Sequence, residues 1–151
     1  MTVEERDAFL AEQRTCRLGT LSPGNVPHVT PVWYWWDGEA VWIHSVIKSQ
    51  RWANLQRQPL CSLVVDAGDS YFELHGVELS CRAEVIGEVP REGRPNPQLE
   101  PVEQHFAERY FGMTWPGYDL RHAWLRLLPE KIVSWDFRKL SGTETVFNPN
   151  R

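Results

Sequence analysis

Short strand-like segments separated by turn signals fill most of the sequence and limit the folds that are open to it. Proline, glycine and asparagine favour turn conformations, so we expect turns at residues 22–25, 37–38 and 67–70. The segments between these turns predict six or seven short strands, without a regular alternation of strands and helices. We therefore expect a mainly β (α+β) fold, a small antiparallel barrel with a few flanking helices.

The positions of several elements follow from the same patterns. Helical spacing of apolar residues predicts helices over residues 3–14, 49–57 and 102–111. In the second half of the chain, strands are expected over residues 71–74, 77–89, 123–128 and 131–137. Gly76 is expected to form a bulge or bend, and Pro129 and Glu130 to separate the last two strands.

Length, charge and hydropathy argue against several classes of protein. With 151 residues, the chain is expected to form a single domain over 1–151. Its net charge of −4 argues against a general nucleic-acid binder. No apolar run reaches the roughly 18 residues of a membrane span, and the polar N-terminal segment is unlike a signal peptide. Three cysteines without metal-ligand spacing predict ordinary thiols in a reducing cytoplasm.

The segment from Lys48 to Arg51 has the character of an anion site. Ser49 is a good N-cap for the helix 49–57, because its hydroxyl can accept from backbone N–H groups that lack a partner. Lys48 and Arg51 crowd the same helix end, where acidic side chains are normally favoured. Together with the amide of Gln50 and the free N–H groups, they indicate a site for phosphate. A capped surface helix with solvated charges is the alternative that spacing leaves open.

A second segment, the expected strand over 26–36, contains Pro27 and Pro31. Proline in a strand indicates an edge or a bulge, because it removes a ladder donor. Backbone groups around Thr30–Trp33 are therefore expected to be free to bind something other than a strand. The eight tryptophans suit a core, a subunit interface or the walls of a pocket for a flat aromatic ligand. A phosphate-type anchor beside this strand suits a flat, phosphorylated redox cofactor, which carries the chemistry itself.

No pattern of side chains predicts a self-sufficient hydrolytic site or a metal site. The sequence has no GxSxG motif, no HExxH motif and no pair of carboxylates placed for acid–base catalysis. Metal-ligand spacing is also absent among the five histidines, His28, His44, His75, His105 and His122. We therefore assign no catalytic residue and no metal ligand from the sequence.

Four segments, in order, resemble the split-barrel flavin and deazaflavin proteins often labelled pyridoxamine-phosphate-oxidase-like. They are residues 14–21, 27–34, 48–55 with Pro59, and 134–140. The Lys-Ser-Gln-Arg stretch and the Ser-Trp-Asp-x-Arg-Lys-Leu ending look most like actinobacterial reductases that use the deazaflavin coenzyme F-420. The resemblance implies an antiparallel split β-barrel that forms a homodimer, with the cofactor in a groove between the subunits.

The resemblance also implies roles for particular residues. The cofactor phosphate would be contacted by Lys48, Ser49, Gln50 and Arg51, with Ser45 beside them. The cofactor ring would be lined by Thr30, Pro31, Val32 and Trp33. Trp135 would close the substrate side, from its own or the other subunit, and plain core packing is the alternative for Trp135. Residues 90–101 and the loop around Trp115 match no family motif, although such regions border the substrate pocket in these reductases.

By this resemblance the chain is expected to be an F-420-dependent oxidoreductase that passes a hydride to an electron-poor conjugated acceptor, such as a quinone, a coumarin-type lactone or a tetrapyrrole. An FMN-dependent reductase or oxidase of the same fold is the first alternative, because FMN also carries a phosphate and a tricyclic ring. The acidic tail of a deazaflavin should favour extra cations, for which Arg57, Arg14 and Arg17 are candidates. A non-catalytic cofactor-binding or tetrapyrrole-binding protein is the second alternative.

Overall fold

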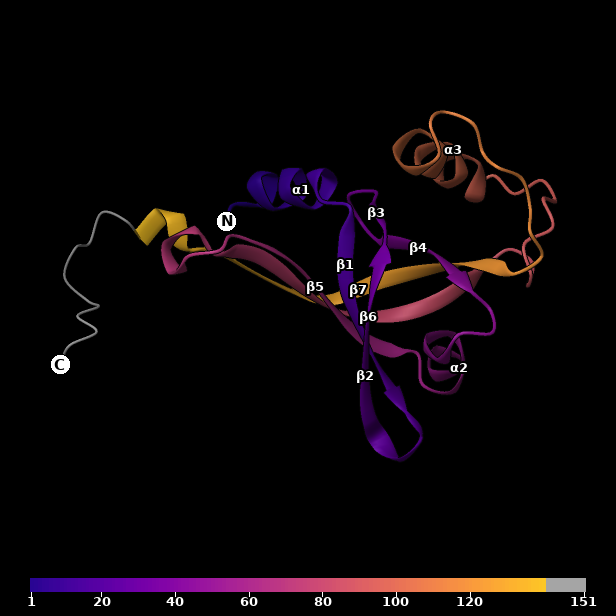
Figure 1. Cartoon of the computed structure of the whole chain (residues 1–151), viewed down its shortest axis with the longest axis horizontal. Coiled ribbons are helices and arrows are strands. Elements are labelled where there is room, and N and C mark those ends of the chain that lie inside the picture. Colours follow the sequence, from indigo (N-terminus) through magenta and orange to yellow (C-terminus); the bar gives the residue numbers. More distant parts are fainter. Residues whose placement is uncertain (141–151) are drawn as a thin grey trace.

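The computed structural model describes residues 1–140, so that residues 141–151 of the expected domain lie outside the described part. Within it, one antiparallel sheet has the strand order β2-β1-β5-β6-β7-β4-β3 and the form of a split barrel (Figure 1). The strands are β1 (Thr15–Ser22), β2 (Val26–Trp33), β3 (Trp35–Trp36), β4 (Val41–Val46), β5 (Leu60–Ala67), β6 (His75–Ile86) and β7 (His122–Asp136). The helices are α1 (Val3–Glu12), α2 (Gln50–Arg57) and α3 (Leu99–Tyr110), with the short 3-10 helices η1 (Pro23–Asn25), η2 (Tyr71–Glu73) and η3 (Phe137–Leu140). The expected mainly β fold is confirmed.

The helices define two ends of the long β6–β7 ribbon. Figure 1 shows α2 and α3 toward one end, while η2 and η3 lie at the other. At the first end β4 finishes and β7 begins, because Val46 pairs with His122. This is the end at which the predicted anion site lies. Within the described residues, none of the helices combines the length and the apolar character that crossing a membrane requires.

Two hydrophobic clusters lie on opposite faces of β4 and β7. Side chains alternate along a strand, so Ile43 and Leu125 face the barrel interior, where they pack with residues from α1 and α2. Trp42 and Trp124 face the other way and pack beneath α3 against Phe106. The burial of these aromatic side chains fixes α3 over the start of β7. Several tryptophans are therefore core residues, which was one of the three roles expected for them.

Some details of the strands differ from the expectations. Residues 71–73 form η2 instead of a strand, because Ser70 and Glu73 make a reciprocal capping box. β7 continues through Pro129 instead of breaking there. The register shift in the β6–β7 pair lies at Ser80/Cys81, opposite Pro129, and this irregularity accommodates the proline inside the strand.

Gly76 does not form the expected bulge. It pairs in register with both Asp66 and Trp135. A Cβ atom built on Gly76 would lie 2.5 Å from a ring carbon of Trp135 and 2.8 Å from the carbonyl oxygen of Val65. Glycine is therefore required here by the close approach of the Trp135 ring to the backbone.

Candidate functional site

The turn between β4 and α2 is organised by Ser49. Its hydroxyl donates to the carbonyl oxygen of Val46 at 2.7 Å and accepts from the backbone N–H of Trp52 at 3.1 Å. Ser49 is therefore the N-cap of α2, as the sequence predicts. Because both of these bonds are internal, the Ser49 hydroxyl proton is committed to Val46, and the residue shapes the turn more than it offers a donor.

Arg51 connects this turn to two strands. Its Nη1 donates to Thr30 Oγ1 on β2 at 3.0 Å, and its Nε donates to Ser45 Oγ on β4 at 3.3 Å. Ser45 is completely buried, so the guanidinium is held on the barrel side of β4. Burial lowers the pKa of Arg51, although an arginine keeps its charge far above neutrality. The structure thus brings together Thr30, Ser45 and Arg51, which lie far apart in the sequence.

Several donors at this turn have no partner among the described residues. They are the ammonium group of Lys48, Nη2 of Arg51 and the backbone N–H groups of Gln50 and Arg51, which precede the first bonded N–H of the helix. The Gln50 side chain, in contrast, donates to Asn54 at 2.8 Å. No carboxylate lies within residues 48–52 of the sequence. A cluster of cationic and N–H donors without an acid is a suitable site for a phosphate group.

The strand expected to line the cofactor ring is the edge strand of the sheet. Among the described strands, β2 pairs with β1 alone, in continuous register from Val26 to Trp33, so the prolines mark an edge and not a bulge. Along β2, Thr30 and Val32 are half-buried, whereas Pro31 and Trp33 are exposed. The free edge of β2 leaves backbone groups available, as the sequence predicts.

A cavity of about 440 Å³ opens beside Trp33. It is lined by Trp33, His44, Phe106, Phe111, Tyr118 and His122, together with residues 116, 117 and 119 of the loop after α3. Trp33 stacks on Tyr110 with ring centroids 4.5 Å apart, which fixes the ring at the cavity mouth. The cavity therefore joins one predicted ring-lining residue to side chains that the sequence did not single out.

The polar side of this cavity is formed by two histidines and an aspartate. His122 Nδ1 lies 2.6 Å from Asp119 Oδ2, and the rings of His122 and His44 stack at 4.4 Å. Burial and the charge of His122 lower the pKa of His44 to about 3, so His44 is neutral at physiological pH. Burial acts to raise the pKa of Asp119, but hydrogen bonds from the backbone of Arg121 and from His122 lower it. The result is a hydrogen-bonded Asp119–His122 pair beside a neutral imidazole.

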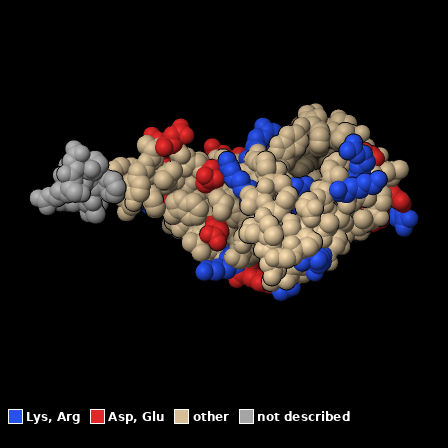
Figure 2. All heavy atoms as spheres, turned by 60° about the horizontal axis from the view of Figure 1, so that its bottom comes forward, with Lys and Arg blue, Asp and Glu red and all other residues tan. Residues whose placement is uncertain are grey.

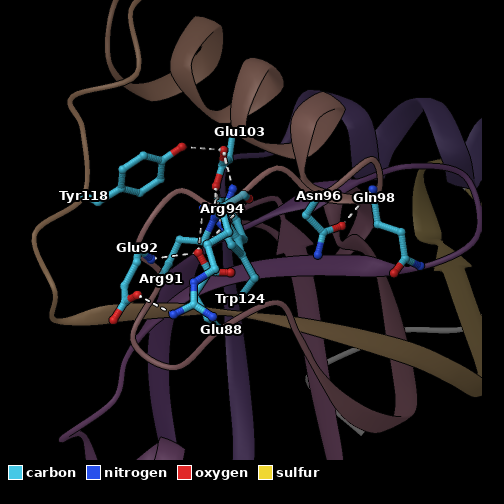
Figure 3. A network of polar contacts seen from close by, with 9 residues as sticks. All are labelled: Glu88, Arg91, Glu92, Arg94, Asn96, Gln98, Glu103, Tyr118 and Trp124. Carbon is cyan, nitrogen blue, oxygen red and sulfur yellow. Dashed lines mark hydrogen bonds and ion pairs between the residues drawn. The ribbon is translucent and has the colours of Figure 1, made fainter.

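A buried polar network holds the loop that carries Asp119 (Figure 3). Arg91 is 3% exposed and bonds Glu103 through Nε at 2.7 Å and Glu88 through Nη1 at 2.6 Å. The same Glu103 carboxylate accepts from Trp124 Nε1 and from the Tyr118 hydroxyl, each at 3.1 Å. This network links the 88–94 segment, α3 and β7 to Tyr118 in the cavity wall.

The network also explains two features of residues 90–101. The backbone N–H of Arg91 donates to the carbonyl oxygen of His122 at 2.8 Å, which ties this loop to the start of β7. Gly93 has a φ of +89°, and a Cβ there would lie 2.2 Å from the Tyr118 ring. Residues 90–101 thus reach the cavity indirectly, whereas residues 116–119 line it.

Trp135 lies elsewhere in the described chain. It is near the far end of β7, over Gly76, and within one protomer it does not line the cavity. Among the functional candidates, sequence reasoning missed His44, Asp119 and His122. The Asp-x-x-His spacing of residues 119–122 was a signal for such a pair, but the partner His44 comes from a distant strand.

The chain is similar to known proteins in sequence and in fold. The family model described as pyridoxamine 5'-phosphate oxidase matches residues 2–136. Among curated proteins no relative matches the sequence. A conserved hypothetical protein of Mycobacterium tuberculosis has a similar structure, with 26% identity, a TM-score of 0.70 and coverage of 98% of this chain and 92% of that chain.

Two further solved structures have lower identity and show the fold alone. An F-420 reductase is 20% identical, with a TM-score of 0.65, and the match covers 84% of this chain and 94% of that chain. An FAD-binding protein of Mesorhizobium loti is 18% identical, with a TM-score of 0.68, and the match covers 89% of this chain and 92% of that chain.

Proposed function

The chain belongs to the pyridoxamine 5'-phosphate oxidase family, and on this basis we propose that it is an oxidoreductase that binds the deazaflavin coenzyme F-420. Reduced F-420 supplies a hydride, which would pass to an electron-poor conjugated acceptor such as a quinone, a coumarin-type lactone or a tetrapyrrole. The solved F-420 reductase and FAD-binding protein of similar fold support a cofactor of the flavin type.

The observation that carries this proposal is the unpaired donor set at the start of α2. The charges of Lys48 and Arg51 and the N–H groups of Gln50 and Arg51 fit a phosphate in number and chemistry. Arg51 is already held by Thr30 and Ser45, so little side-chain entropy would be lost on binding. We assign the phosphate to these residues, with Ser49 and Ser45 positioning them.

The ring of the cofactor belongs, in this proposal, along the free edge of β2. Backbone groups near Thr30 and Pro31 would bond the ring edge, while Val32 and Trp33 would bound it. Trp33 also lines the neighbouring cavity, so a ring on this edge could reach an acceptor bound there. The residues of the chain would hold the hydride donor and the acceptor close together, align them and exclude water. Such positioning lowers the reaction barrier substantially when the geometry is right.

Cations without an acidic partner would suit the acidic tail of F-420, and they are the support for F-420 over FMN. Figure 2 shows several Lys and Arg side chains on the half of the molecule that carries α2 and α3, with Asp and Glu side chains among them. Of the three candidate cations for the acidic tail, Arg17 is paired with Asp66 at 3.0 Å. Arg57 lies on α2 and bonds the backbone carbonyl of Leu21, so it keeps its charge uncompensated among the described residues. Arg14 similarly bonds the carbonyl oxygen of Arg109.

We further propose that the working unit is a cytoplasmic homodimer, as the resemblance implies. Apolar side chains remain exposed on β2 and β7, with Val29 63% exposed, Trp33 50% and Val133 43%. A second protomer would cover such side chains and close the groove in which the cofactor lies. If a Trp135 ring closes the substrate side, it would come from the second protomer.

A titration followed by a turnover assay tests the proposal. The purified protein is titrated with F-420, FMN and biliverdin by fluorescence, and reduced F-420 is then mixed with a panel of quinones. Binding of F-420 at micromolar concentrations with quinone reduction is the expected result. Preference for FMN, or tight biliverdin binding without turnover, would instead identify one of the two alternatives. Failure of both F-420 and FMN to bind below high micromolar concentrations would refute the proposal.

A further inference from the structure

The cavity beside Trp33 has the composition of a site for a flat conjugated molecule. Its apolar walls are aromatic, formed by Trp33, Phe106, Phe111 and Tyr118. Its volume of about 440 Å³ lies within the range of pockets that enclose small organic ligands. Its polar groups are concentrated at one place, where His122, Asp119 and His44 meet. A ligand that fits would be an aromatic body with a polar atom at one edge.

The hydrogen bonds of His122 show which ring atom would meet that polar edge. Nδ1 is engaged by Asp119 at 2.6 Å, so the ring orientation is fixed. Asp119 is fixed in turn, because its Oδ1 accepts from the backbone N–H groups of Arg121 and His122. Nε2 makes no hydrogen bond with any described residue and is the nitrogen left for a ligand. The aspartate thus holds the ring so that Nε2 points to where a ligand atom would lie.

We propose that this cavity binds the acceptor as a conjugated carbonyl compound, and that His122 is the catalytic proton donor to the carbonyl oxygen. The proposal rests on the proposed function, which supplies the reductant. The electron pair of a hydride from the reduced cofactor would form a new C–H bond with the conjugated system, and a π electron pair of that system would move onto the carbonyl oxygen. The Nε2–H bond of His122 breaks as the O–H bond forms, and His122 becomes a neutral imidazole with its proton on Nδ1. Solvent then returns the proton to Nε2.

The groups around His122 suit this role. Asp119 is a positioning residue, because it holds the ring and stabilises the imidazolium charge. His44, from β4, is neutral and stacked on His122, so it competes for no proton at physiological pH. Tyr118 faces the same cavity, but its hydroxyl donates to Glu103, which in turn is compensated by Arg91. The loop and β4 present three titratable groups to His122, namely Asp119, His44 and Tyr118.

The link to the proposed cofactor site comes through β4 and β2. Val46 pairs with His122 across the β4–β7 ladder, and the carbonyl oxygen of Val46 also accepts from the Ser49 hydroxyl. Trp33 belongs both to the predicted ring-lining strand and to the cavity wall. Trp33 is therefore the residue that the assigned ring site and the acceptor cavity share.

Binding to the cavity can be measured without the cofactor. 1,4-Naphthoquinone is titrated into the cofactor-free protein while ¹H–¹⁵N spectra of the histidine rings are recorded. His122→Asn identifies the His122 signals, and His105, exposed on α3 and stacked on Trp35 outside the cavity, is the internal control. The expected result is a saturable shift of the His122 and His44 signals with no shift for His105. Unmoved His122 signals in a protein that binds F-420 normally would overturn the cavity assignment alone.

Proton donation is measured by turnover with reduced F-420 and 1,4-naphthoquinone. His122→Asn should lower kcat on the order of 100-fold, the scale of general acid catalysis, with the F-420 Kd unchanged. A protonated donor predicts that the wild-type kcat falls as the pH rises, and this dependence should disappear in His122→Asn. Asp119→Asn should also lower kcat, with partial recovery in Asp119→Glu, while the matched His105→Asn retains wild-type kcat. A wild-type kcat and pH profile in His122→Asn would overturn the assignment of His122, whereas failure of F-420 to bind would overturn the proposed function instead.

Discussion

Removal of Arg91 should destabilise the protein strongly, because the side chain is buried between two acids. Arg91 is 3% exposed and pairs with Glu103 at 2.7 Å and with Glu88 at 2.6 Å. The backbone N–H groups of Glu92 and Arg94, together with Arg91, hold the pKa of Glu88 at about 2 against the opposing effect of burial. Arg91→Ala would leave two carboxylates without their cation in a poorly solvated place. Breaking a buried ion pair in this way costs about 3–5 kcal/mol of the free energy of unfolding.

Two further variants separate the charge effect from other causes. Glu103→Gln removes the charge that Arg91 faces and keeps one oxygen, which can accept from Trp124, while an amide group replaces the oxygen that accepts from Tyr118. A smaller loss of about 1.5–3 kcal/mol is therefore expected. Arg82→Ala removes the same side chain from the exposed pair with Glu130, in which Arg82 is 50% exposed. That control should cost no more than about 1 kcal/mol.

Urea unfolding followed by tryptophan fluorescence measures these differences, because Trp124 lies inside the network. Circular dichroism at 25 °C verifies that each variant is folded before unfolding begins. If Arg91→Ala and Arg82→Ala had the same midpoint and slope, the network would carry no more stability than a surface ion pair. The reasoning about buried charge would then be wrong. The network could then no longer be said to hold the loop that carries Tyr118.

Three other predictions concern residues that shape the fold around the site. Gly76→Ala should cost about 1–3 kcal/mol in urea unfolding, because the added methyl group overlaps the Trp135 ring, and a neutral result would contradict the close contact. Ser49→Ala should lower the free energy of unfolding by about 1 kcal/mol through loss of the α2 cap, and an unchanged midpoint would count against it. His44 has a pKa of about 3 in the folded protein and an ordinary value of 6.5 when unfolded, so only the unfolded state gains a proton between these limits. The wild type should therefore lose more stability than His44→Gln as the pH falls from 6.5 toward 3, and equal losses would refute the burial of a neutral His44.

The N-cap of α2 and the edge strand could be predicted because their signals are local. The N-cap at Ser49 and the cations beside it occupy adjacent positions, and the prolines of β2 mark an edge by chemistry alone. What spacing could not supply was the connection between them. The bridge from Arg51 to Thr30 and Ser45 depends on how β2, β4 and α2 meet in three dimensions.

The cavity was missed for the same physical reason. His44 and His122 lie on different strands, and only the β4–β7 register brings their rings together. The expected break of β7 at Pro129 was wrong because a register shift in the pairing with β6 tolerates the proline, which no local rule foresees. The expected strand at 71–74 was wrong because the capping box at Ser70 and Glu73 outweighed the β propensity of the aromatic residues.

The central claim is that the turn between β4 and α2 binds the phosphate of the cofactor. Its most direct test is a fluorescence titration of F-420 into the wild type, Lys48→Ala, and the Lys48→Ala/Arg51→Ala double variant. Lys48 is exposed, so its removal leaves the fold intact, and an Arg82→Ala/Lys131→Ala variant removes the same charge elsewhere on the surface. We expect the double variant to lose about 3 kcal/mol, a roughly 100-fold weaker Kd, with an intermediate loss for Lys48→Ala and little change in the control. An F-420 Kd in the double variant equal to that of the control would contradict the assignment of the phosphate to this turn.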